Sequence, residues 1–74
     1  MKTTIKAKAG DFKFATWSES KDYIFKYKKY NLRCEILDEK MKLFSYDYIL
    51  LLEGKETDID AYISFLRITG FSIK

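Results

Sequence analysis

The sequence lacks histidine and proline altogether and contains a single cysteine, Cys34. Without histidine, the Ser-His-Asp and Cys-His catalytic arrangements and the histidine-based zinc sites are excluded. Cys34 cannot form an internal disulfide and has no candidate base close to it in sequence, so we expect it to be a small core residue. We therefore expect no enzyme activity, no metal and no cofactor.

Long apolar segments are also missing. The longest run, Ile49–Leu52, is much shorter than the roughly 20 residues that span a bilayer. Lysines interrupt the amino terminus, so it has no apolar segment of a secretory signal. Together with the free cysteine, these features lead us to expect a soluble, cytoplasmic protein with no membrane partner. Because no linker or repeat divides the chain, we expect residues 1–74 to form a single domain.

The sequence is instead rich in hydrophobic residues, which make up 47 % and include six Phe, six Tyr and one Trp. Such a composition is typical of a folded protein. The fold of a 74-residue chain often needs a disulfide, a metal or a partner subunit to stabilise it. The single cysteine and the absence of histidine argue against the first two. Pairing two copies would bury the excess aromatic surface, so we expect a homodimer.

Charge is distributed unevenly along the chain. Residues 1–33 contain nine Lys and Arg against three Asp and Glu, whereas residues 34–74 contain five against eight. The two halves differ in sign, which could attract nucleic acid or an acidic partner, or draw two copies together. The simpler interpretation is that solvated lysines keep a small, aromatic-rich protein in solution.

Alternation of polar and apolar residues predicts the strands. It occurs over residues 4–9 and 12–16, on either side of a Gly-Asp turn, which indicates two strands or one long bent strand. Residues 32–36 alternate as well, until the polar residues 38–40 interrupt the pattern. The most hydrophobic segment, residues 46–52, is expected to be a central strand.

The clearest helix is expected over residues 57–69, capped by Thr57 or Asp58 and ended by Gly70 before a short last strand. Asp58 and Asp60 could form an acid/base or metal pair, but capping and the helix dipole explain carboxylates at a helix start. The buried face of this helix is expected to contain Ile59, Tyr62, Ile63 and Leu66.

A second helix is expected over residues 19–31, with candidate N-caps at residues 18–20. A strand is the alternative, because Phe25 does not fit the apolar face of the helix. That face would contain Tyr23, Ile24, Tyr27 and Tyr30, with lysines opposite.

Aromatic residues and lysines interleave in the same segment. Bases stack on aromatic rings while lysines neutralise phosphates, so this mixture is typical of a single-stranded nucleic-acid binder. Helical spacing separates the rings from the lysines, which favours an amphipathic helix with a buried tyrosine face. The candidate interaction face comprises Tyr23, Phe25, Lys26, Lys28, Lys29 and Tyr30.

With residues 4–9 left aside as an extra amino-terminal strand, the predicted order is β-α-β-β-α-β. This order indicates an α+β, ferredoxin-like sandwich, in which two helices cover one face of a four-stranded antiparallel sheet. The right-handed crossover rule places the first and third strands in its centre.

Residues 34–74 resemble the NIL domain, a small ACT-like member of the ferredoxin-like folds. The matching features are Cys34-Glu35-Ile36-Leu37, a polar hairpin, the strand ending in Glu53-Gly54, the helix from Ile59, and Gly70 before the last strand. The resemblance implies a non-catalytic regulatory module that binds a small molecule, such as an amino acid, at a dimer interface. It transfers no ligand contact to a particular residue. The alternatives are a protein-interaction module or small inhibitor that uses the lysine and aromatic face, and a single-stranded nucleic-acid binder.

Overall fold

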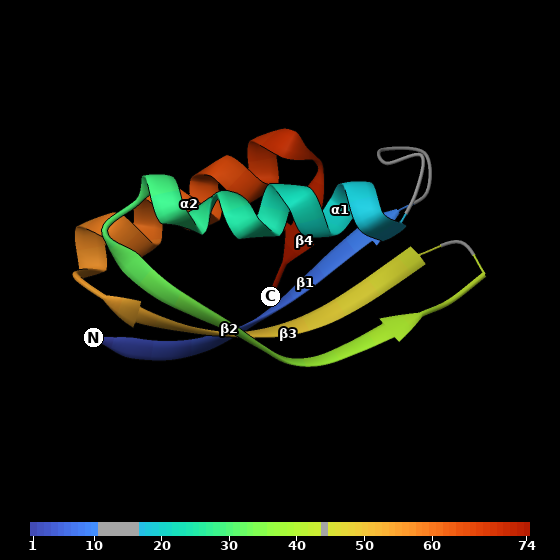
Figure 1. Cartoon of the computed structure of the whole chain (residues 1–74), viewed down its shortest axis with the longest axis horizontal. Coiled ribbons are helices and arrows are strands. Elements are labelled where there is room, and N and C mark those ends of the chain that lie inside the picture. The colour runs from blue at the N-terminus through green and yellow to red at the C-terminus, as the bar shows by residue number, and fades with distance from the viewer. Residues whose placement is uncertain (11–16, 44) are drawn as a thin grey trace.

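The computed structural model describes residues 1–10, 17–43 and 45–74. Their helices lie on one side of a twisted sheet, so the described chain forms two layers (Figure 1). The elements in chain order are β1 (Lys2–Gly10), α1 (Trp17–Ile24), the 3₁₀-helix η1 (Phe25–Lys29), β2 (Leu32–Met41), β3 (Ser45–Gly54), α2 (Glu56–Thr69) and β4 (Phe71–Ile73).

The sheet has four strands in the order β2-β3-β1-β4, and all neighbours are antiparallel. The α+β class, the four antiparallel strands and the central position of the strand predicted over residues 46–52 are therefore confirmed. The prediction that residues 4–9 form an extra strand is wrong, because they belong to β1 in the centre of the sheet. The strand predicted over residues 12–16 lies outside the described residues.

β1 is central because β3 pairs with one of its edges and β4 with the other, and one of its faces is largely buried. Ile5, Ala7 and Ala9 are buried, whereas the lysines between them are exposed. This pattern is typical of a strand that is buried on one face only. The register with β3 runs without a shift from Lys2 opposite Glu53 to Gly10 opposite Ser45.

The segment predicted as a helix over residues 19–31 is helical as far as Lys29 and ends in a turn at residues 30 and 31, so the strand alternative is wrong. The helix begins at Trp17 and continues from Phe25 as η1. Residues 18–20 therefore lie within α1 and do not cap it. Ser20 is fully buried, and its hydroxyl lies 2.6 Å from the hydroxyl of Tyr48 on β3.

The helix predicted over residues 57–69 is confirmed as α2, with Ile59, Tyr62 and Leu66 buried. It begins one residue earlier, at Glu56, and its N-cap is Lys55 without a side-chain capping bond. The expected caps Thr57 and Asp58 are therefore wrong, because both residues lie in the first turn. Gly70 ends the helix as predicted, with a φ of 126° that disfavours other residues.

β2 is longer than its alternating pattern predicted. Asp38, Glu39 and Lys40 do not interrupt the strand, which continues to Met41. The register with β3 shifts between Ile36 and Asp38, so Leu37 is the extra residue of a β-bulge. The polar residues after the bulge therefore stay paired with β3 at an exposed edge of the sheet.

The core lies between the sheet and the helices. Leu50 and Leu66 are fully buried, as expected, and the hydroxyl of Tyr62 donates a hydrogen bond to the carbonyl of Ile24 (2.7 Å). Cys34 is half-buried and packs against this core. Neither helix of the described residues has the length and apolar character that a membrane crossing requires.

Candidate functional site

In the structure, some residues of the candidate interaction face predicted over α1 and η1 pack against the rest of the protein, and the others are exposed. The ring of Tyr30 packs against Tyr62 and Phe65, with ring centroids 5.8 and 5.9 Å apart. The ammonium of Lys26 lies 4.6 Å from the centre of the Tyr23 ring, which is half-buried. Two of the three rings of this face are therefore engaged in packing, and only its Phe25, Lys28 and Lys29 are exposed.

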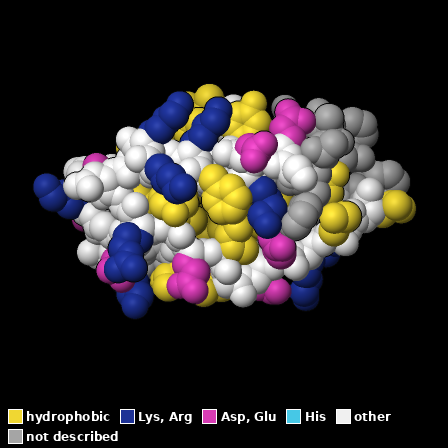
Figure 2. Space-filling view, viewed as in Figure 1, with side chains coloured by type: hydrophobic (Ala, Val, Ile, Leu, Met, Phe, Trp, Pro, Cys, Tyr) yellow, Lys and Arg dark blue, Asp and Glu magenta, His cyan; other side chains and the backbone are white. Residues whose placement is uncertain are grey.

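The visible surface of the molecule carries mixed charge. In Figure 2, basic and acidic side chains are interspersed, and hydrophobic side chains are exposed between them. No single-sign region therefore dominates the view that includes the helices.

The carboxylates considered for catalysis do not come together with other ligating groups. Asp58 and Asp60 lie in the first turns of α2, where negative charge is favourable. Within residues 1–10, 17–43 and 45–74, no three His, Cys, Asp or Glu side chains are placed to hold a metal ion.

Cys34 is held as a protonated thiol at neutral pH. Burial raises the pKa of Cys34 to about 11, against a smaller lowering by the hydroxyl of Tyr62, whose oxygen lies 3.9 Å from the sulfur. A thiol needs its thiolate form to act as a nucleophile. The geometry of Cys34 is therefore that of a packing residue.

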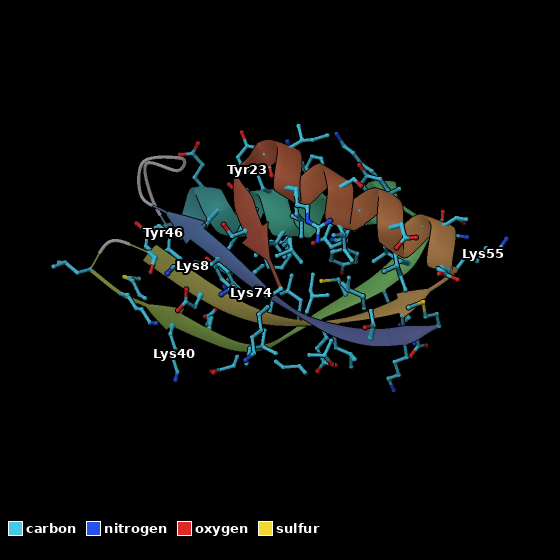
Figure 3. The ribbon with its side chains drawn as sticks, turned by 180° about the vertical axis from the view of Figure 1, so that it is seen from behind. Lys8, Tyr23, Lys40, Tyr46, Lys55 and Lys74 are labelled. Atoms are coloured by element: carbon cyan, nitrogen blue, oxygen red, sulfur yellow. The ribbon has the colours of Figure 1, made fainter. Side chains whose placement is uncertain are left out.

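The side of the sheet that faces away from the helices carries a cavity of about 280 Å³. Figure 3 shows Lys40 projecting from this open side. All four strands or the residues next to them contribute side chains. We call this site the lysine cradle, formed by Lys6, Lys8, Lys40, Lys42 and Lys74 together with Asp38, Asp47, Ile49 and Ser72.

Positive charge in the cradle exceeds negative charge, with five lysines against two aspartates. Lys42 pairs with Asp47, with Nζ 2.8 Å from Oδ2, and the other four lysines form no ion pair with any described residue. The backbones of Lys6 and Lys74 exchange hydrogen bonds of 3.1 and 2.9 Å, which places the two lysines opposite each other on neighbouring strands. Like charges placed opposite each other in this way repel. A bound anion would relieve that repulsion.

Asp47 occupies the middle of the cradle. In the register it lies opposite Lys8 on one side and Lys40 on the other. Its Oδ1 is buried and accepts no hydrogen bond from the described residues. A buried acceptor without a donor is costly. The Asp47 side chain as a whole is 29 % exposed, so a donor in the cradle could meet its carboxylate group.

The sequence did not indicate the cradle, because its residues come from both ends and the middle of the chain. The only local signal was the alternation of Lys6 and Lys8 with buried alanines, which places both lysines on the outer face of a strand. Which residues face them depends on the strand order. No protein-family model matches this chain, and no curated protein matches it.

Proposed function

We propose that this protein is a non-catalytic regulatory module that binds a small anionic molecule in the lysine cradle. The observation that carries the proposal is a cavity lined by five lysines and by Asp47, whose buried Oδ1 accepts no hydrogen bond from the described residues. A cluster of cations attracts a carboxylate or phosphate, and an unbonded carboxylate oxygen attracts an ammonium or a hydroxyl. The ligand is therefore an anion that also carries a hydrogen-bond donor.

The size and lining of the cavity narrow the ligand class. Its volume of about 280 Å³ lies just below the usual range of ligand pockets, roughly 300–1,000 Å³, so a small ligand is expected. Ile49 supplies an apolar side chain between the charged groups. An acidic amino acid such as aspartate or glutamate fits these properties, because its carboxylates can meet lysines while its ammonium meets Asp47.

The fold proposed for this module is the ferredoxin-like arrangement. Support comes from the order of the elements and from a sheet in which the first and third strands are central. Such a two-layer fold leaves one face of the sheet uncovered, and the cradle lies on that face. We also propose that the module is a homodimer. The resemblance to the NIL domain supports the ligand-sensing role, although the cradle is built within one chain.

Two triple variants test the site, and each removes three positive charges, one in the cradle and one away from it. Changing Lys8, Lys40 and Lys74 together to glutamine removes three exposed cradle lysines. Changing Lys26, Lys28 and Lys29 to glutamine is the matched control on η1. Binding of aspartate, glutamate, inorganic phosphate and a single-stranded oligonucleotide would be followed by calorimetry and by amide NMR shifts at two salt concentrations.

We expect aspartate or glutamate to bind the wild-type protein and the η1 variant alike, and to lose at least tenfold in affinity in the cradle variant. Equal binding by both variants would refute the site. Preferential binding of the oligonucleotide, with loss in the η1 variant and steep weakening by salt, would instead support the nucleic-acid interpretation.

Asp47→Asn tests the role assigned to the carboxylate. Succinate has the two carboxylates of aspartate without its ammonium. Comparing the two ligands therefore isolates the contact between the ammonium and the carboxylate of Asp47. We expect the wild type to prefer aspartate over succinate and the variant to lose that preference, because a neutral amide no longer attracts the ammonium. An unchanged preference would show that Asp47 does not select the ligand.

A further inference from the structure

β2 forms one edge of the sheet, and its first half has backbone groups that no strand of the described residues pairs. Leu32 lies opposite Gly54, but the amide of Gly54 donates to the carbonyl of Met1 on the other side (2.9 Å). Hydrogen-bonded and non-bonded pairs alternate along an antiparallel ladder. The backbone groups of Leu32, Cys34 and Ile36 therefore point outward from the sheet, whereas those of Arg33 and Glu35 face β3.

The two ends of this stretch are defined. At its start, the amide of Leu32 donates to the carbonyl of Tyr30 (2.8 Å), which leaves the Leu32 carbonyl directed outward. At its end, the bulge at Leu37 interrupts regular pairing. The opposite edge of the sheet is β4, which has three residues only. The stretch Leu32–Ile36 is therefore the longest regular edge that the described residues leave open to another strand.

We infer that this stretch pairs with the same stretch of a second copy, antiparallel and centred on Cys34. In an antiparallel pair of these edges, the backbone groups that point away from β3 in one copy must meet those of the other copy. If most of the stretch is to pair, the two-fold axis can therefore lie at Arg33, Cys34 or Glu35. Charge decides among these three registers. An axis at Arg33 places arginine opposite arginine, and one at Glu35 places glutamate opposite glutamate, and both arrangements are destabilising. An axis at Cys34 places Arg33 opposite Glu35 of the copy, twice by symmetry.

The same register matches the apolar residues on the other face. Leu32 lies opposite Ile36 of the copy, and both are half-buried hydrophobic residues packed at the margin of the core. Cys34 exchanges both backbone hydrogen bonds with its counterpart, and the amide of Ile36 donates to the carbonyl of Leu32 across the seam. The joined sheet is continuous, and the open face of each protomer lies on the same side. The interface uses residues outside the lysine cradle.

Charge reversal at the seam gives a test that includes its own rescue. Arg33→Glu and Glu35→Arg each place like charges opposite each other, so we expect each single variant to be monomeric by analytical ultracentrifugation at micromolar concentration. The double variant restores opposite charges in every pair and should dimerise. An equimolar mixture of the two single variants should form a heterodimer, because one contributes two glutamates and the other two arginines.

Two control variants test whether a change of charge away from the interface affects dimerisation, and a measurement on the wild type avoids any effect of a variant on folding. Lys55→Glu at the N-cap of α2 and Asp60→Arg within α2 make the same changes of charge at exposed positions and should leave the dimer intact. In the wild type, the amides of Cys34 and Ile36 should exchange hydrogen more slowly as protein concentration rises, and this readout needs no variant.

Three experimental outcomes would overturn this inference. A monomeric wild type with fast exchange at Cys34 and Ile36 would reject the interface, while ligand binding in the cradle could still be present. A dimer that persists in both single variants would reject this register in favour of another contact, such as pairing of the open faces. Failure of the mixture and of the double variant to associate would reject the Arg33–Glu35 contact.

Discussion

The buried hydroxyl pair between Ser20 and Tyr48 is expected to connect the helix layer to the sheet energetically. The two oxygens are 2.6 Å apart, and the residues are 0 % and 1 % exposed. Burial is the main reason why the pKa of Tyr48 is raised above its ordinary value. The hydroxyl of Tyr48 is therefore neutral at physiological pH, and its short contact links α1 to β3.

Tyr48→Phe and Ser20→Ala each remove one partner of this buried pair. Losing one partner of a buried hydrogen bond costs about 1–3 kcal/mol, whereas removing both can be nearly neutral. A protein of this length is stable by roughly 4–11 kcal/mol, and each kcal/mol lowers Tm by about 4–8 °C. Each single variant should therefore be clearly destabilised. The double variant should be destabilised by less than the sum of the two.

Urea unfolding of the wild type, both single variants and the double variant gives the coupling free energy. We expect a value of about 0.5–3 kcal/mol, as for residues in direct contact. Ser18→Ala is the control, because Ser18 is an exposed residue of the same helix and should contribute little. Additivity of the two single changes within about 0.5 kcal/mol would refute the proposed contact.

Three further predictions concern the core, the end of α2 and the thiol. Leu66→Ala should cost about 2–5 kcal/mol in urea unfolding, since Leu66 is fully buried, and a near-wild-type midpoint would contradict the packing of α2 on the sheet. Gly70→Ala should cost about 1–2 kcal/mol in the same assay, because Gly70 has a φ of 126°, and an unchanged stability would contradict that backbone. Alkylation of Cys34 by iodoacetamide at pH 8 should be about 100-fold slower than in the urea-unfolded chain, because thiolate content falls tenfold per pKa unit. The rate in the folded protein should rise with pH until about pH 11, where the raised pKa of Cys34 lies, and a plateau near pH 9 would contradict its burial.

Elements with a strong local pattern could be predicted from the sequence. The helical spacing of Ile59, Tyr62 and Leu66 predicted α2, and all three are buried. The apolar run containing Leu50 predicted a central strand, which is β3. In both cases the residues that form the core also carry the periodicity, so a local pattern was sufficient.

Features that depend on partners distant in sequence could not be predicted in the same way. Residues 4–9 alternate lysine with small residues, and nothing in that segment showed that it pairs with β3 along its whole length. Ser20 was interpreted as a cap because serine often caps helices, whereas its hydroxyl is satisfied by Tyr48, 28 positions away. The lysine cradle depends on the order of all four strands, which no local segment contains.

The bulge at Leu37 connects the two surfaces proposed for β2. Before the bulge, odd-numbered residues such as Arg33 and Glu35 lie on the open face, opposite Glu53 and Leu51. A shift of one residue moves every later side chain to the other face. After the bulge, the even-numbered Asp38 and Lys40 therefore lie on the open face and line the cradle.

The same shift turns Glu39 toward the helix layer, where Lys21 of α1 reaches it at 3.4 Å. If Leu37 were paired regularly, with no bulge, Lys40 would face the helices and Glu39 would face solvent on the open side. The bulge also ends the regular edge on which a second copy can pair. The bulge at Leu37 therefore separates the part of β2 proposed for self-association from the part that contributes Asp38 and Lys40 to the proposed ligand site.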